Sequence, residues 1–236
     1  MTQTNTPAPD YKHTLAQALS YLDAESVDVP VSLRLKVKRM TGKAGIKPLD
    51  EITARYNDDI IEALTTFFEG GSITAPRNAF RAAMVEAFNS AFDTGWSDGE
   101  GTLPIEENAV EWLQAQISAE AGNIDTLFQQ AKELRKEEDF DFFTWATARA
   151  DGYSATVLSI YNAARMLAQK NKIGIWRLGN TEKHCPSCAG LDGQSHRLSW
   201  YVANNYIPRK PGAAMKCGGY NCDCRVTDKK GDEITL

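Results

Sequence analysis

Residues 176–194 read W-R-L-G-N-T-E-K-H-C-P-S-C-A-G-L-D-G-Q, and residues 217–225 read C-G-G-Y-N-C-D-C-R. These two stretches contain all five cysteines of the 236-residue chain, spaced C-x2-C, then a long loop, then C-x4-C-x-C. Two short turns that each offer two thiolates are typical of tetrahedral zinc sites. The candidate metal ligands are Cys185, Cys188, Cys217, Cys222 and Cys224.

Three interpretations of the cysteines are open. A structural zinc site is favoured, because an odd number of cysteines cannot pair fully within one chain. Disulfides are the second interpretation, for a particle exported to oxidising surroundings. A redox or catalytic thiol is the least favoured, because the C-x-x-C lacks a βαβ context.

The zinc interpretation leaves the ligand set open. Cys185 and Cys188 are the firm pair, and Cys217 with either Cys222 or Cys224 completes a set of four. Two nearby histidines are reserve ligands, although each is more readily explained as a solvated surface residue. They are His184 and His196.

Charge divides the chain at about the same place as the cysteines do. Residues 172–236 carry ten Lys or Arg against six acids, a formal charge of +4, whereas the remainder carries −9 and the whole chain −5. Such a split predicts two units in different surroundings. A membrane-spanning helix needs about 18 consecutive apolar residues, and every apolar run in the sequence is much shorter, so no membrane contact is expected.

The rest of the chain reads as helices. Apolar residues recur at three- and four-residue spacing over four segments, 48–69, 77–96, 104–134 and 142–170. A bend or break is expected at Gly122, and a further short helix over 11–22. Residues 31–38 alternate apolar and basic side chains, which predicts an edge strand in preference to a contact with an acidic partner or nucleic acid.

Residues 173–178 predict a short strand that leads into the first cysteine turn. The sequence that follows is rich in loop residues and poor in apolar ones, so we expect a bound metal to stabilise it. The predicted fold is therefore mainly α, a helical body with a small C-terminal zinc-stapled β/turn module. The predicted boundaries are a flexible N-terminus over 1–9, the helical body over 10–171 and the cysteine-rich module over 172–236.

Signatures of catalysis are mostly absent from the sequence. It has neither a G-x-S-x-G elbow nor an H-E-x-x-H helix, and no H-x-E precedes Cys185-Pro186-Ser187-Cys188 as a zinc deaminase requires. Four thiolate ligands would also close the coordination shell of zinc against a reactive water. We therefore expect a protein that is not an enzyme, and rank a hydrolase or redox role last.

Together with Y-N-A-A-R at Tyr161–Arg165, the two cysteine stretches resemble the C-terminal part of the phage head-morphogenesis, or Mu F-like minor head, proteins. The resemblance covers about residues 142–226. It implies a structural minor head protein of a tailed bacteriophage that acts in head morphogenesis. It also implies partners in the portal or the major capsid protein, and a location in the virion head, with host cytoplasm as the site of assembly.

A second functional hypothesis is a zinc-stabilised nucleic-acid-binding module that contacts packaged or packaging DNA. Its basis is the basic tail, in which aromatic residues lie among the cations. These aromatic residues are Trp176, Trp200, Tyr201, Tyr206 and Tyr220. Four zinc-bound thiolates would reduce the +4 charge of the tail to +2, which weakens this hypothesis.

Overall fold

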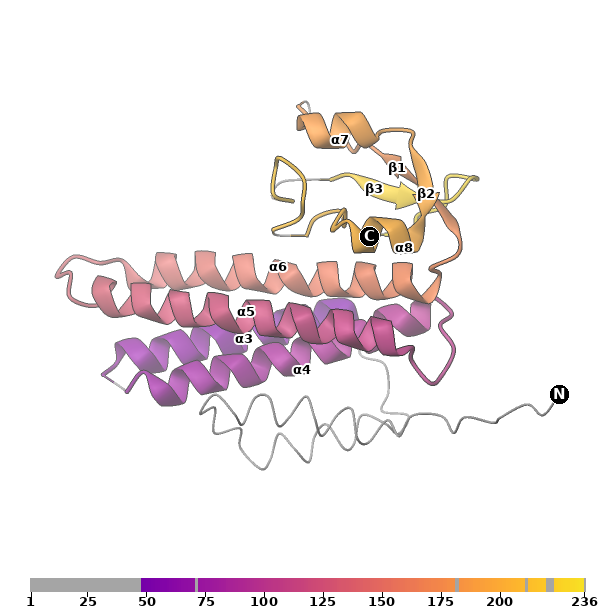
Figure 1. Ribbon diagram of the computed structural model, residues 1–236. Coiled ribbons are helices and arrows are strands. Elements are labelled where there is room, and N and C mark those ends of the chain that lie inside the picture. The colour runs from indigo at the N-terminus through magenta and orange to yellow at the C-terminus, as the bar shows by residue number, and fades with distance from the viewer. Residues whose placement is uncertain (1–47, 71, 181–182, 211, 220–222, 236) are drawn as a thin grey trace. The chain divides into compact units, whose positions relative to one another are not determined.

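The computed structural model describes residues 48–70, 72–180, 183–210, 212–219 and 223–235, and these belong to one compact unit, residues 45–236 (Figure 1). The flexible terminus, the short helix and the alternating strand predicted before residue 48 lie outside the described residues.

Four long helices form the body: α3 (Leu49–Phe68), α4 (Thr74–Asp98), α5 (Glu107–Leu134) and α6 (Phe142–Ala168). Each predicted helical segment is confirmed, with ends displaced by up to three residues. The expected break at Gly122 is absent, because α5 continues through this position as one helix. A Cβ on Gly122 would meet nothing within 4 Å, so the glycine lies in an open part of the helix surface.

The core of the body is aromatic and centres on α4. Phe80 packs edge-on against Tyr56 of α3 at a ring-centroid distance of 6.1 Å and against Phe128 of α5 at 6.3 Å. All three side chains are fully buried. These residues recur on one face of each helix, so the apolar stripes read from the sequence are the core-facing stripes.

Helices α4 and α6 approach each other closely through small residues. A Cβ on Gly95 would lie 3.0 Å from the Ala164 Cβ and closer still to the Tyr161 carbonyl oxygen. Near the end of α4, the Tyr161 hydroxyl donates a 2.7 Å hydrogen bond to the Asp98 carboxylate. The absence of a side chain at Gly95 thus sets the distance between the two helices.

Helix α6 joins the body to the C-terminal module. Its N-terminus is capped by the Asp141 carboxylate, which accepts a 3.1 Å hydrogen bond from the Thr144 backbone N–H. After α6 the chain turns within four residues into the first strand of the module. The backbone N–H groups of Leu198 and Ser199 donate to the carbonyls of Lys172 and Lys170, so this turn is bonded to the start of α8.

The module is a three-stranded antiparallel sheet with two short helices. Its strands are β1 (Ile173–Arg177), β2 (Ser195–Arg197) and β3 (Arg225–Thr227), in the order β2-β1-β3. The helices are α7 (Pro186–Leu191) and α8 (Leu198–Ala203), and α8 packs against α6. The predicted strand at 173–178 is confirmed as β1, and the two helices of six residues each are additions to the predicted β/turn module.

One face of this sheet is the core of the module. Trp176 is fully buried at its centre, with its ring centroid 6.0 Å from that of Tyr201 on α8. A Cβ on Gly174 would collide with Val226 and Leu198, so glycine is needed where α8 lies against the sheet. The chain is therefore mainly helical with a small C-terminal sheet, as the sequence predicted.

Candidate metal centre

The first half of the centre is built by the C-P-S-C turn at the start of α7. Cys185 is the N-cap residue, and its sulfur accepts a hydrogen bond from the Cys188 backbone N–H at 3.4 Å. Pro186 occupies the first turn, where its fixed φ suits a helix start and its missing N–H is not needed. This geometry directs both thiols of the turn to one side of α7, with Cys188 buried beneath Cys185.

The second half is a tight loop that presents Cys217. The Gly218 N–H donates to the Met215 carbonyl at 2.7 Å, and both Gly218 and Gly219 have positive φ, at 61° and 79°. A Cβ on Gly219 would collide with the Lys210 backbone. Glycine is therefore required here both for the backbone conformation and for the close approach of another loop.

A hydrogen bond between the two halves holds them together. The Lys216 backbone N–H donates to the Ser187 hydroxyl at 3.1 Å, which ties the residue before Cys217 to the middle of the C-P-S-C turn. Ser187 therefore has a positioning role that the sequence interpretation missed. The only signal for it was its place between the two cysteines.

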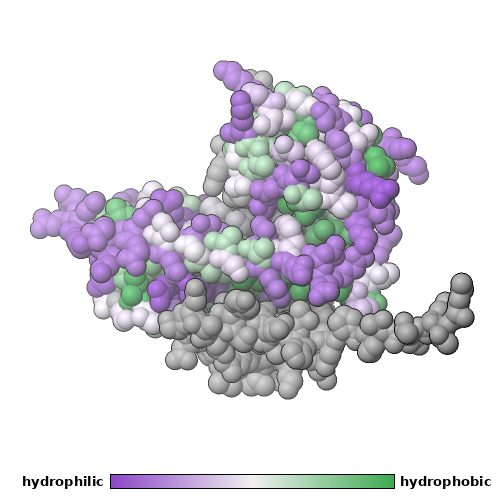
Figure 2. Space-filling model, in the orientation of Figure 1, coloured by the Kyte–Doolittle hydropathy of each residue, from purple (hydrophilic) through white to green (hydrophobic). Residues whose placement is uncertain are grey.

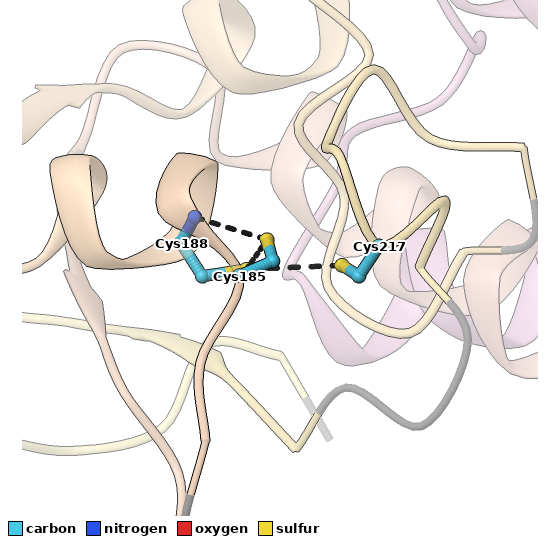
Figure 3. Close-up of side chains that lie close together, drawn as sticks. All are labelled: Cys185, Cys188 and Cys217. Atoms are coloured by element: carbon cyan, nitrogen blue, oxygen red, sulfur yellow. Dashed lines mark hydrogen bonds between the residues drawn. The ribbon is translucent and has the colours of Figure 1, made fainter.

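The three thiols converge on one point, as Figure 3 shows. The Sγ atoms of Cys185 and Cys188 are 3.3 Å apart, those of Cys188 and Cys217 are 4.0 Å apart, and all three lie within 4.8 Å of one another. Zn–S bonds of about 2.3 Å in a tetrahedron place sulfurs about 3.8 Å apart. Three close cysteines that can hold a metal ion are thus present, with spacings that bracket the tetrahedral value.

The thiols differ in acidity. Burial opposes ionisation of Cys185, but hydrogen bonds from the Cys188 backbone N–H and from the thiols of Cys188 and Cys217 lower its pKa to about 7. Burial and the neighbouring Cys185 raise the pKa of the Cys217 thiol. The thiolate is the metal-binding form, so the lowered pKa of Cys185 favours its role as a metal ligand.

The remaining predicted ligands are placed differently. Cys224 is buried in the core of the module and is not part of the three-cysteine group, whereas Cys222 lies outside the described residues. The ring of His196 stacks on Trp200 at a centroid distance of 3.7 Å, and His184 is half-buried outside the group. The four cysteines that the structure describes form no disulfide.

One sulfur near the centre was missed by the sequence interpretation. Met215 is buried, and its Sδ accepts a hydrogen bond from the Cys188 thiol at 3.6 Å. The thioether completes an apolar, sulfur-rich floor beneath the cysteines. Nothing in the sequence pattern distinguished Met215 from an ordinary loop residue.

The aromatic residues of the module are placed unevenly. Trp176 and Tyr201 are fully buried, Trp200 and Tyr206 are half-buried, and Tyr220 lies outside the described residues. Two of the five predicted stacking residues are therefore core residues that no nucleic-acid base can reach.

Comparisons of the chain with models of protein families, with curated proteins and with solved structures find no match. Among the helices that the structure describes, none has the length and apolar character needed to cross a membrane.

Proposed function

We propose that this chain is a structural minor head protein of a tailed bacteriophage, and that zinc holds its C-terminal module together. The observation that carries the proposal is the convergence of Cys185, Cys188 and Cys217 directly after the α6–β1 connection. A long helix, a strand with a buried tryptophan, and a C-x-x-C turn follow one another in the order of the head-morphogenesis proteins that the sequence resembles.

Zinc is the proposed ion because cysteine offers a thiolate and the measured sulfur–sulfur distances of 3.3 and 4.0 Å lie on either side of the value of about 3.8 Å for a tetrahedral zinc site. Thiolate sets of this kind prefer zinc, copper(I) or iron–sulfur clusters among biological metals, and zinc needs no redox chemistry to remain bound. The structural role follows from the contacts of the module, since the metal would link α7 to the loop that carries Cys217. Two hydrogen bonds already join those segments, from the Lys216 backbone N–H to the Ser187 hydroxyl and from the Cys188 thiol to the Met215 sulfur.

The zinc part of the proposal is tested by metal analysis and thiol titration of the purified full chain. We expect one zinc per chain, and loss of that zinc in the Cys185→Ser, Cys188→Ser and Cys217→Ser variants. Cys224→Ser tests the other described cysteine, which is as buried as Cys188 and lies outside the three-cysteine group, but is one of the two candidates for the fourth ligand. Cys222→Ser then shows whether that residue is the fourth ligand.

Protein without zinc that contains two disulfides would overturn the zinc site, as would unchanged zinc in Cys188→Ser. Because α3, α4, α5 and α6 pack against one another without the module, we expect Cys188→Ser to disturb the module while the helical body stays folded. A melt with one transition identical to that of the wild type would contradict this expectation.

The assembly role is tested on particles. Quantitative mass spectrometry of purified heads from the phage that encodes the chain should detect it at a few copies per particle, and cross-linking should join it to the portal or the major capsid protein. Deletion of its coding sequence should reduce the yield of filled heads. A chain that is found only in the host cytoplasm and never in heads would refute the role without affecting the zinc result.

A further inference from the structure

A group of aromatic side chains lies at the end of the bundle where α5 leads into α6 (Figure 1). Phe68, the last residue of α3, is at its centre. The ring centroid of Phe68 lies 4.4 Å from that of Phe142, 5.7 Å from that of Phe140 and 5.8 Å from that of Trp145. All four side chains are only half-buried, so part of each residue faces solvent.

Phe143, the second residue of α6, adds an exposed ring, since it is 72% exposed. The Cα–Cβ bonds of a helix tilt towards its N-terminus, so the side chains in the first turn of α6 project towards the same end of the bundle. Phe and Trp are enriched where proteins contact one another, and a patch of large exposed apolar side chains marks such a contact site. The group is called the aromatic tip below and comprises Phe68, Phe140, Phe142, Phe143 and Trp145.

The loop that joins α5 to α6 gives the aromatic tip an acidic border. Four of its residues are exposed acids, and among the residues that the structure describes none of them has a recorded ion pair. In Figure 2, hydrophilic residues predominate at this end of the bundle, with hydrophobic residues among them. The four acids are Glu137, Glu138, Asp139 and Asp141, and the last two flank Phe140 in sequence.

The cations of the adjoining helix turns leave this border negative. Lys136 forms an ion pair with Glu133, which precedes the loop on α5. The guanidinium group of Arg135 lies over an aromatic ring of α3 at 5.2 Å, and that of Arg149 lies over the Trp145 ring at 5.8 Å. With one arginine over Trp145 and four acids in the loop, the surface around the tip is net negative.

We propose that the aromatic tip binds a protein partner whose contact surface is apolar and flanked by lysines and arginines. The rings supply the apolar area that such a contact buries, and the four carboxylates select cationic residues around it. Nucleic acid and anionic membranes also bind exposed aromatic residues, but both present phosphates that the carboxylates repel. The inference goes beyond the proposed function, and it holds whether or not the cysteine site takes zinc.

The probe is a fluorescently labelled synthetic helix of about 14 residues, with leucines on one face and lysines on the other. Its anisotropy is followed as the full chain is added at about 50 mM and about 150 mM salt, and we expect binding that weakens with salt. Phe143→Ala should bind about 30-fold more weakly, the factor that corresponds to about 2 kcal/mol of lost burial, and Phe143→Leu should retain much of the affinity. Glu137→Gln/Glu138→Gln should bind about 5-fold more weakly, because exposed ion pairs each contribute little.

Each change has a matched control elsewhere on the body. Leu103→Ala removes a side chain that is 81% exposed from the connection between α4 and α5. Glu107→Gln/Glu111→Gln removes two exposed acids from the start of α5. Both controls should bind the peptide as the wild type does, and circular dichroism identifies any variant that fails to fold.

The proposal is overturned if the wild type does not bind the peptide, if Phe143→Ala binds it as tightly as the wild type, or if a control loses as much affinity as its matched variant. Binding of the full chain to vesicles of anionic phospholipid that is lost in Phe143→Ala would assign the tip to a membrane instead. A dimer of the wild type that becomes a monomer in Phe143→Ala, measured by sedimentation velocity, would assign it to a second copy of the chain.

Discussion

Replacing Gly95 by alanine should destabilise the protein, although alanine is the better helix former. Intrinsic propensity alone favours alanine by about 1 kcal/mol in a helix interior. In the structure, however, the new Cβ would lie 3.0 Å from the Ala164 Cβ and nearer still to the Tyr161 carbonyl oxygen, whereas ordinary contacts are 3.4–4 Å. The obstacle is backbone, so α4 and α6 must separate for the methyl group to fit.

The expected magnitude follows from these opposing effects. Overpacking of this kind costs about 3 kcal/mol at the upper end of its usual range, and the gain in propensity offsets about 1 kcal/mol. The net loss of about 2 kcal/mol corresponds to a fall in Tm of about 4–8 °C for a chain of this size. Thermal unfolding followed by circular dichroism at the helix band measures it.

The matched control is Gly122→Ala in α5, where the new Cβ would meet nothing within 4 Å. Propensity acts there without opposition, so Tm should rise by about 2–4 °C. The two glycine-to-alanine changes therefore have opposite expected signs. If Gly95→Ala melts at or above the wild-type temperature, the close approach of α4 and α6 is not what the structure describes.

Three further predictions concern the cap of α6, the contact between α4 and α6, and the metal. Asp141→Ala removes the hydrogen bond to the Thr144 N–H and should lower the free energy of unfolding, measured with urea, by about 1 kcal/mol. Asp139→Ala in the same loop should lower it far less. Burial and the hydrogen bond to Asp98 raise the pKa of Tyr161 to about 12, so the folded state holds this proton more tightly than the unfolded chain does. The stability that results is complete below about pH 10 and is lost as the pH rises towards about 12. In the Tyr161→Phe variant, the free energy of unfolding should therefore depend less on pH over that range. Removal of zinc by a chelator should lower the melting temperature of the module and leave the melting temperature of the helical body unchanged. A single transition at the wild-type temperature would contradict the structural role of the metal.

The helices could be predicted from the sequence because their apolar spacing is long and regular. Ile52, Tyr56 and Ile60 recur on one stripe of α3, and all three are buried. Gly122 was a misleading signal, since the buried residues that follow it, Ile124 and Leu127, hold α5 to the core and outweigh the local cost of glycine.

The short helices of the module could not be predicted in the same way. Six residues make less than two turns, which is too few for a helical period to show. Helix α8 is stabilised by tertiary packing, because Tyr201 inserts under the sheet and donates a hydrogen bond to the Gln194 carbonyl at 3.0 Å. Such tertiary contacts join residues from different segments, so the spacing of residues within the helix does not reveal them.

The candidate site was predicted in its composition but not in its geometry. Spacing identified Cys185 and Cys188 as a pair, because a C-x-x-C turn brings its own thiols together. The choice of Cys217 as their neighbour depends on a loop whose position is set by the Lys216–Ser187 hydrogen bond, nearly thirty residues apart in sequence. The burial of Trp176 and Tyr201 likewise depends on tertiary packing, which composition does not reveal.

Helix α6 has a mechanical consequence. It runs without interruption for 27 residues, about 40 Å, from its capped end to the turn that is bonded to α8. Its flanks pack against α3 and α4, and the module is joined to its C-terminal end and packs against it through α8, so we expect α6 to be a stiff connection between the body and the module. We therefore expect a pull or twist on the sheet to be carried along the helix axis towards the opposite end of the bundle.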